Sequence, residues 1–347
     1  MDGALLGMTC QQEQEVRGWH PHRIGGYSNV DATQFAVVES VVCVPSPDGD
    51  RDELWMIVRR YIDGATRRYV DWCEYHHEEG DDPQDAFYLD SGLTLDNTQN
   101  ATLTPGTGAD VKGTAGVVFT AGSAIFGSGD VGKYIHYRYN TTSVTGKVTW
   151  RTAVAKITAY TNTTHVVCTI NKAFPGLSAI AALGWRLTVT TVSGLGHLEG
   201  QVVQVWADGA NHPDRTVTSG AITLQVAASK VHVGLACDAV IQPMPIEAGS
   251  ADGTAQGKTQ RISRCGLRFH ETAGCRYGSD ETAQLDRVEL RSGSSNMDEE
   301  LPLFTGDKVV SWPAGYEGPA IVTVVADQPG PCTLVAIMPQ VTTNDSR

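Results

Sequence analysis

The stretch 193–235 constrains the fold more than any other part of the chain, because short apolar runs alternate there with turn residues. In each run the apolar side chains recur at every second residue, as in strands with one buried face. Asp208-Gly209 and Ser219-Gly220 lie between the runs, where glycine accepts a positive φ and Asp or Ser closes the turn. We therefore expect four sequential antiparallel strands. The apolar runs are 203–205, 222–226 and 231–235.

The composition indicates that the rest of the chain is also rich in strands. The 347 residues include 37 glycines and 15 prolines, and 41% are hydrophobic. Recurring Val and Thr favour strands, the glycines favour tight turns, and the length allows a sizeable core in two or three domains. An all-β fold is predicted. Further strands are expected at 4–11, 15–23, 35–44, 54–61, 65–75, 116–120, 133–139, 153–160, 164–170, 185–192, 261–271, 284–290, 308–312, 320–326 and 333–338.

Three strings in the central stretch resemble the tail nozzle or hub proteins of short-tailed, double-stranded DNA bacteriophages. They are GLGHLEGQ at 194–201, ADGANHPDR at 207–215 and ASKVHVGL at 228–235. The resemblance covers nearly the whole chain. It extends to 53–69, 251–258, 301–308 and 329–339.

This resemblance implies a structural virion protein in the phage tail, forming part of the nozzle or hub ring below the portal through which genomic DNA is retained and ejected. It implies a propeller-like nozzle body, a homo-hexameric ring, and contacts with other tail and head-to-tail adaptor proteins. Double-stranded DNA is expected to pass through the lumen without tight binding. Family members are usually longer, so this chain is expected to match their C-terminal half. The N-terminal part of the body is then a separate chain or has been lost.

The sequence changes character at 93–192, where Thr, Gly, Ala and Asn dominate. We therefore predict a first body segment at 1–92, a small inserted β-domain at 93–192 and a second body segment at 193–347. Within the insert, FGSGDVGKYIHY at 126–137 and AKITAYT at 155–161 resemble a compact, barrel-like module of phage structural proteins. That likeness implies no enzymatic activity.

Two short motifs suggest ligands, but their contexts argue against both. The segment 127–132 satisfies GxGxxG, yet the alternating aromatic run 133–139 predicts a strand where a dinucleotide site needs a helix. The segment 76–79, HHEE, lacks the HExxH spacing, and Gly80 and Pro83 mark a polar loop. No metal-binding residue, cofactor-binding residue or cofactor is predicted.

The formal charge of −13, from 39 acidic and 26 basic residues, opposes wrapping of nucleic acid. Arg59, Arg60, Arg67 and Arg68 flank Asp63-Gly64 on a predicted hairpin. We interpret these arginines as a solvated face or an inter-subunit pairing surface. No stretch approaches the roughly 20 apolar residues that cross a bilayer, so no membrane partner is expected.

The eight cysteines include no CxxC pair, which argues against zinc. Several lie in apolar strand contexts, and we expect reduced core thiols. They are Cys10, Cys43, Cys73, Cys168, Cys237, Cys265, Cys275 and Cys332.

Two other functions stay open. The first is a carbohydrate-binding host-adhesion tail protein, with Trp19, Trp150, Trp185 and Trp206 stacking on sugars, although aromatics in strands more often belong to the core. The second is a hydrolase such as a tail-borne depolymerase, which needs paired carboxylates. No context selects such a pair, so no catalytic residue and no enzymatic activity are predicted.

The remaining candidate site residues are histidines. His270-Glu271 belongs to no triad that the sequence orders. His197, His212 and His232 recur in the central stretch. His232 lies on the strand face opposite Val231 and Val233, so we expect it to hydrogen-bond at an interface.

Overall fold

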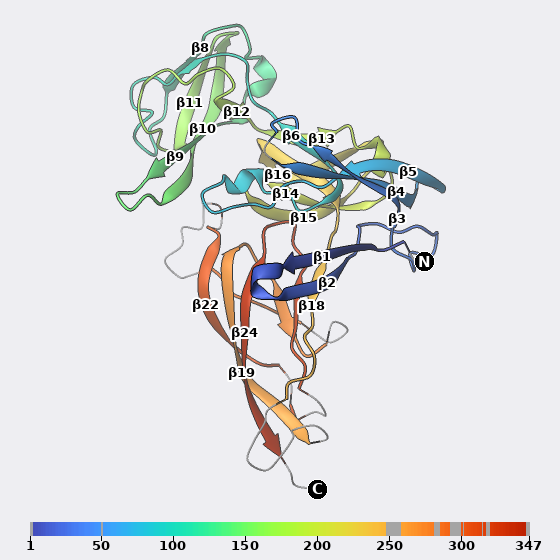
Figure 1. Ribbon diagram of the computed structural model, residues 1–347. Coiled ribbons are helices and arrows are strands. Elements are labelled where there is room, and N and C mark those ends of the chain that lie inside the picture. Colours follow the sequence, from blue (N-terminus) through green and yellow to red (C-terminus); the bar gives the residue numbers. More distant parts are fainter. Residues whose placement is uncertain are drawn as a thin grey trace.

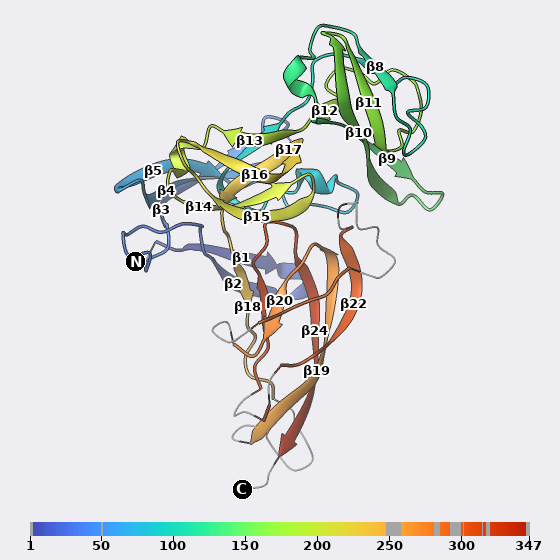
Figure 2. The ribbon, with the colours of Figure 1, turned by 180° about the vertical axis from the view of Figure 1, so that it is seen from behind.

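The computed structural model describes residues 3–49, 51–247, 258–280, 285–291, 300, 302–313, 315–316 and 320–344. Over these ranges the chain is all-β, as predicted, and its only helices are short 3₁₀ segments. None of the helices in this part of the chain is long and apolar enough to cross a membrane. Figures 1 and 2 show three regions: a lobe at 103–187, a central body at 24–96 and 189–235, and a stalk at 239–344 that tapers toward the C-terminus.

The lobe is one six-stranded sheet that curls into about half a barrel. Alternate residues of its longest strand, Ala153, Ala155 and Ile157, are fully buried. They belong to a hydrophobic cluster made entirely of residues from this region. The sheet order is β12 (Trp185–Leu187), β9 (Tyr134–Thr142), β10 (Val148–Asn162), β11 (His165–Lys172), β8 (Val117–Ala121) and β7 (Leu103–Thr104).

The central body contains an antiparallel four-stranded sheet that joins segments from both sides of the lobe. Its order is β15 (Ala210–Thr216), β14 (Val202–Ala207), β17 (Lys230–Leu235) and β6 (Asp90–Asp96). β16 (Ala221–Ala228) leaves this order and pairs with β13 (Val189–Ser193) in a second sheet. The expectation of sequential pairing was therefore confirmed for β14 with β15 but wrong for β16 and for β17, which pairs with β14 and β6.

The two predicted turns of the central stretch are confirmed. Asp208 and Gly209 have φ values of 48° and 80°, and Ser219 and Gly220 have values of 53° and 68°. The first turn closes the β14–β15 hairpin, and the second closes an isolated bridge between Thr218 and Ala221.

The predicted strand faces are confirmed with one exception. Val203 and Val205 of β14 and the apolar residues of β17 are buried, whereas Val226 of β16 is 68% exposed. The sequence had placed Val226 on the buried face with Ile222 and Leu224.

The N-terminal region supplies one sheet and one hairpin. β3 (Val37–Pro45), β4 (Asp52–Ile62) and β5 (Ala65–Trp72) form a meander, and Asp63-Gly64 makes the predicted turn. β1 (Leu5–Gln11) and β2 (Val16–His22) pair only with each other among the described strands. We call this hairpin the arm.

The stalk consists of two small sheets around a shared core. One has the order β22 (Phe304–Ser311), β19 (Thr259–Thr272) and β24 (Thr333–Asn344). The other has the order β18 (Ala239–Ile241), β23 (Thr323–Ala326), β20 (Arg276–Gly278) and β21 (Asp286–Arg287). Leu267, Phe269 and Val322 are almost completely buried between them. Part of the strand expected at 284–290 lies outside the described residues.

Candidate functional site

The outer face of the β3–β4–β5 sheet exposes a group of large apolar side chains. Trp55 pairs with Val42 on one side and Trp72 on the other, and the two indole rings stack with centroids 6.3 Å apart. Val70 is 67% exposed in the same layer. Contiguous apolar patches of this kind mark interaction surfaces. We call it the tryptophan face: Val42, Val44, Trp55, Ile57, Val70 and Trp72.

The opposite face of this sheet is buried and contains Arg60. The Arg60 side chain is fully buried, its Nε donates to Gly25 O at 2.8 Å, and its Nη1 lies 2.7 Å from Asp71. The expectation that Arg60 belongs to a solvated face was therefore wrong. It points inward because it lies on β4 in the same alternation as Met56 and Val58.

The other three arginines of the predicted basic patch lie at the surface. Arg59 and Arg68 both contact Glu39, at 3.0 and 2.6 Å, and Arg67 lies 3.4 Å from Asp63. Each arginine therefore has a carboxylate partner. This neutralisation disfavours the patch as a phosphate-binding surface.

The arm presents a second exposed apolar surface. Met8 pairs with Trp19 and Leu6 pairs with Pro21, so these four side chains share one face of the hairpin. Trp19 is 73% exposed and Leu6 is 62% exposed. We call this the arm face; it consists of Leu6, Met8, Cys10, Trp19 and Pro21, and Arg17 lies opposite Cys10 at the end nearest the hairpin turn.

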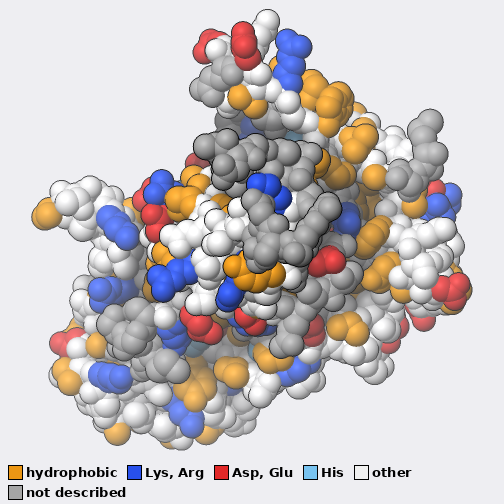
Figure 3. Space-filling model, turned by 90° about the horizontal axis from the view of Figure 1, so that it is seen from below, with side chains coloured by type: hydrophobic (Ala, Val, Ile, Leu, Met, Phe, Trp, Pro, Cys, Tyr) orange, Lys and Arg blue, Asp and Glu red, His pale blue; other side chains and the backbone are white. Residues whose placement is uncertain are grey.

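A hydrophobic groove of about 420 Å³ runs along the stalk. It follows β24 and the segment that begins with β18, both of which are outer strands of their sheets in the described structure. All of its lining residues are apolar, and Met244 and Val335 are 86% and 59% exposed. Seen from the stalk end, hydrophobic side chains reach the surface in several clusters between charged ones (Figure 3). The groove is lined by Ile241, Pro243, Met244, Ile246, Val322, Leu334, Val335, Ala336, Ile337 and Pro339.

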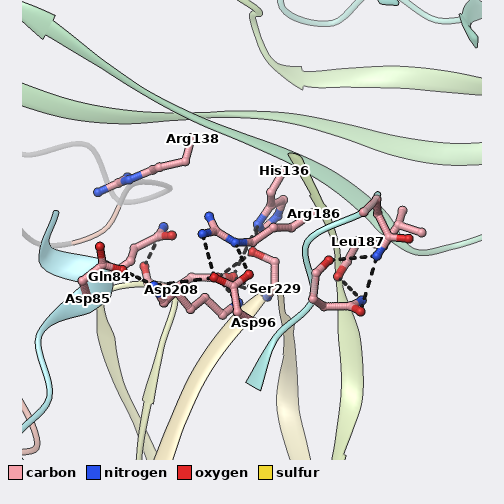
Figure 4. A network of polar contacts seen from close by, with 12 residues as sticks. Gln84, Asp85, Asp96, His136, Arg138, Arg186, Leu187, Asp208 and Ser229 are labelled. Carbon is pink, nitrogen blue, oxygen red and sulfur yellow. Dashed lines mark hydrogen bonds and ion pairs between the residues drawn. The ribbon is translucent and has the colours of Figure 1, made fainter. Parts of the chain in front are cut away.

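A network of charged residues joins the lobe to the central body (Figure 4). Arg138 of β9 is almost fully buried; its Nη2 lies 2.7 Å from Asp82, and it also contacts Glu300. The guanidinium faces the Trp150 ring, 5.6 Å from its centroid. Burial opposes the charge of Arg138, but hydrogen bonds and attraction from Asp82 and Glu300 outweigh it and raise the arginine's pKa.

A second arginine of the lobe extends the network. Arg186 of β12 donates to both oxygens of Asp96, at 2.7 and 3.0 Å. Lys230 lies 3.6 Å from the same carboxylate and also contacts Asp85. Burial opposes ionisation of Asp96, but the contacts with Arg186 and Lys230 outweigh it and lower the pKa of the carboxyl.

His136, Ser229 and Asp208 also meet in this network, but not as a catalytic triad. In such a triad the imidazole lies between the nucleophile and the carboxylate. Here Ser229 Oγ donates directly to Asp208 at 2.7 Å, and His136 Nδ1 lies 3.0 Å from the same hydroxyl. Ser229 is 1% exposed, so a substrate has no access to it. The trio stabilises the Asp208-Gly209 turn and holds it against the lobe.

The tryptophans proposed to bind sugar have different surroundings. Trp185 is fully buried in the lobe, and Trp206 is 3% exposed and donates to Pro83 O at 2.9 Å. Trp150 is half-buried and donates to Gly80 O at 3.0 Å. Of the four, only Trp19 offers an exposed ring. The sequence did not single out Trp55 and Trp72, because apolar residues on both faces of 54–58 hide which face is exposed.

The candidate histidines are held in structural contacts. His232 is 3% exposed; its Nε2 lies 2.8 Å from Gln84 O and its Nδ1 lies 2.7 Å from Thr94 Oγ1. His232 therefore makes hydrogen bonds as expected, but it makes them within the subunit, and the expectation that it lies at an interface was wrong. His212 is also buried, and His197 lies 2.8 Å from Ser91 O.

The two short motifs lie in loops. The segment 73–82 has no regular structure, and 127–132 leads into strand β9 through a 3₁₀ turn, η3 (Ser128–Asp130). The prediction that a strand follows the glycines is confirmed. In the part of the chain that the structure describes, no three His, Cys, Asp or Glu side chains are grouped as a metal site would require.

The cysteines differ in their burial. Cys168, Cys265 and Cys275 are buried, as expected, and burial raises the pKa of Cys168 to about 12. Cys332 is half-buried, and the other four cysteines are exposed: Cys10, Cys43, Cys73 and Cys237. The expectation of core thiols was therefore wrong for these four. The apolar run around Cys43, for example, lies on the outer strand β3.

Comparison with known proteins adds no family assignment: no protein-family model matches the chain, and no curated protein matches it.

Proposed function

We propose that this chain is a structural subunit of a bacteriophage tail, in the nozzle or hub ring through which genomic DNA is retained and ejected. The sequence strings at 194–201, 207–215 and 228–235 support the family. The structural observation that carries the proposal is the amount of exposed surface. The chain has 19008 Å² of accessible surface. A compact monomer of 37.1 kDa has only about 13,600 Å².

This surplus has the size that a ring subunit needs. It amounts to roughly 5,000 Å², and obligate interfaces bury about 2,000 to 5,000 Å² in total, half from each partner. A subunit in a closed ring has two neighbours, so it contributes to two such interfaces. The tryptophan face, the arm face and the groove are the apolar surfaces available for them.

In the proposed ring, the β3–β6 and β13–β17 strands and the stalk belong to a propeller-like body, and the lobe at 103–187, which makes up most of the predicted insert 93–192, is a barrel-like inserted domain. The lobe's separate hydrophobic cluster supports the insertion. The ring is a homo-hexamer that contacts adaptor and tail proteins, and its position in the virion is on the tail axis.

Electron microscopy of the purified protein and of the parent particle tests this proposal. We expect six-fold rings in the purified sample and the same ring on the tail axis, located there by an antibody against the chain. A protein that stays monomeric at tens of micromolar and is missing from the particle would overturn it.

The charge of the chain sets the expected behaviour toward DNA. An excess of 13 negative charges repels phosphates and lets duplex DNA slide through a lumen. We expect no retention of duplex DNA in filter binding at physiological salt. Nanomolar binding that weakens steeply with added salt would contradict the proposal that duplex DNA slides through the lumen without tight binding. The proposed ring is tested separately by microscopy.

One observation favours a second candidate function, a carbohydrate-binding adhesin. Trp55 and Trp72 stack on an exposed sheet, and Trp19 is exposed on the arm. Aromatic rings of this kind stack on the apolar faces of sugars. Saturable binding of host surface glycans that is lost in Trp72→Ala would support this function, whereas unchanged binding or none would exclude the tryptophan face as a sugar site.

A further inference from the structure

We propose that the arm of one copy of this chain docks in the stalk groove of a neighbouring copy, with the arm face turned into the groove. The inference rests on the proposed ring and adds to it the contact that links adjacent subunits. It assigns the groove's occupant as a second copy of this chain.

One end of the arm is attached to the central body, and one face of the arm is exposed. Val38 N–H donates to Gly3 O at 2.9 Å, and Leu5 packs against the small core beneath the β3–β4–β5 sheet. The opposite face carries Met8 and Trp19, which are 50% and 73% exposed. An isolated two-stranded hairpin is marginally stable in water. A partner that covers this face would stabilise it.

The groove selects an apolar, strand-like occupant. Its lining offers no charged or polar side chain that would orient a polar ligand. It runs beside β24, a strand of 12 residues whose outer edge has no partner among the described strands. Long apolar edge strands are aggregation sites unless something covers them. Strand addition at such an edge is a common mode of recognition.

The dimensions of the two surfaces agree. At about 3.3 Å per residue, the seven-residue strands of the arm extend about 23 Å, and β24 extends about 40 Å. The arm can therefore lie along β24 with Trp19 and Met8 over the groove.

The symmetry of the contact also favours a neighbouring copy. The arm and the groove are different surfaces, and each copy carries one of each. A contact between unlike surfaces is heterologous and repeats head to tail, which closes a ring when the rotation allows it. Both halves of the complementary pair are present on this chain, so no other protein is required.

Cross-linking between differently marked copies tests the contact directly. In a background with Cys10, Cys43, Cys73 and Cys237 changed to Ser, one chain carries Met8→Cys and the other carries Val335→Cys. A short bismaleimide should join two chains when the variants are mixed, but not when either is treated alone. Val226→Cys is the control, since Val226 is 68% exposed on a strand outside the groove, and it should give no adduct with Met8→Cys.

A second measurement uses assembly in place of cross-linking. The double change Met8→Glu and Trp19→Glu should preserve the circular dichroism spectrum and raise the dissociation constant of the ring roughly thirtyfold, as loss of an interface anchor does. Val226→Glu should leave it unchanged. Intact rings with no mixed adduct would overturn the arm contact and leave the proposed function standing. A cross-link within a single chain that carries both Met8→Cys and Val335→Cys would also overturn the arm contact. A complete lack of self-association would overturn both the arm contact and the proposed ring.

Discussion

Asn97 and Leu187 lie side by side although they are 90 residues apart: Asn97 Nδ2 donates to Leu187 O at 2.7 Å, and Leu187 N–H donates to Asn97 O at 3.3 Å. Figure 4 shows Leu187 and the hydrogen bonds that it makes here. The chain therefore enters and leaves the lobe at one point. This geometry allows the lobe to be removed without stretching the chain that remains.

We predict that replacing 98–187 with a Gly-Ser-Gly linker leaves a folded body, because the hydrophobic cluster of the lobe contains no body residue. Circular dichroism should show a β-type spectrum with cooperative thermal unfolding. As a control, the same linker in place of 202–216 removes β14 and β15 from the body sheet and should abolish folding. An insoluble or unstructured product of the lobe deletion would refute the insertion.

The two arginine–aspartate pairs at Arg138 and Arg268 should differ greatly in their contribution to stability. Arg138 and Asp82 are 5% and 8% exposed, so Arg138→Ala leaves a buried carboxylate without its main partner and should cost about 3 to 5 kcal/mol. Arg268 and Asp307 are 52% and 47% exposed, so water screens their attraction and Arg268→Ala should leave the free energy of unfolding almost unchanged. Urea unfolding measures both. Equal costs would show that the Arg138–Asp82 contact between the lobe and the central body contributes little to the free energy of unfolding.

His232 should make stability depend on pH. Burial, followed by repulsion from Lys230, lowers its pKa, although the hydrogen bond to Gln84 opposes the shift. The unfolded chain, with a histidine pKa of about 6.5, then binds the proton more readily than the folded chain. Stability is complete above that pH and falls as the pH drops toward the folded-state pKa, by at most about 1.4 kcal/mol per pH unit.

The variant His232→Gln isolates this contribution, because a glutamine amide can donate to Gln84 O and accept from Thr94 at every pH. Chemical unfolding between pH 7.5 and 5.5, roughly one unit either side of the unfolded pKa, should show a shallower pH dependence in the variant. Part of the slope should remain, since burial also lowers the pKa of His77. If stability depends on pH equally in the variant and in the unchanged protein, His232 is not the group whose protonation causes the dependence.

Thiol labelling should separate the cysteines according to their burial. Cys10 and Cys43 are exposed and should react with maleimide in the native protein. Cys168 is buried and its pKa is raised to about 12, so it should react only after unfolding. Peptide mass spectrometry after timed labelling gives the rates. Rapid native labelling of Cys168 would mean that the core of the lobe opens easily.

The sequence predicted the features that depend on neighbouring residues. The hairpin turns at Asp63-Gly64 and Asp208-Gly209 occur where expected, because the φ > 0 requirement is met by the turn residues themselves. Strand positions were also predicted well, since the two-residue period is a local signal. These features established the all-β class.

Features that depend on distant segments were not predictable. Alternation places His232 and Arg60 on definite strand faces, but it does not show what covers those faces. The backbone of Gln84 contacts His232, and the backbone of Gly25 accepts a hydrogen bond from Arg60. The junction is similar: Arg138 contacts Asp82, 56 residues away, without any motif that marks the pair. The tryptophan face was missed because Leu54 to Val58 is apolar on both sides.

The pairing of β6 with β17 sets the order in which a nascent chain can fold. Leu95 pairs with Val231, so β6 leaves the ribosome long before its partner strand is made. At about 5 to 20 residues per second, synthesis of the intervening 135 residues takes roughly 7 to 27 s. The lobe is complete well within that interval and contains its own core. Translation should therefore release a folded lobe first, while β6 waits unpaired and exposed to chaperones until β17 emerges.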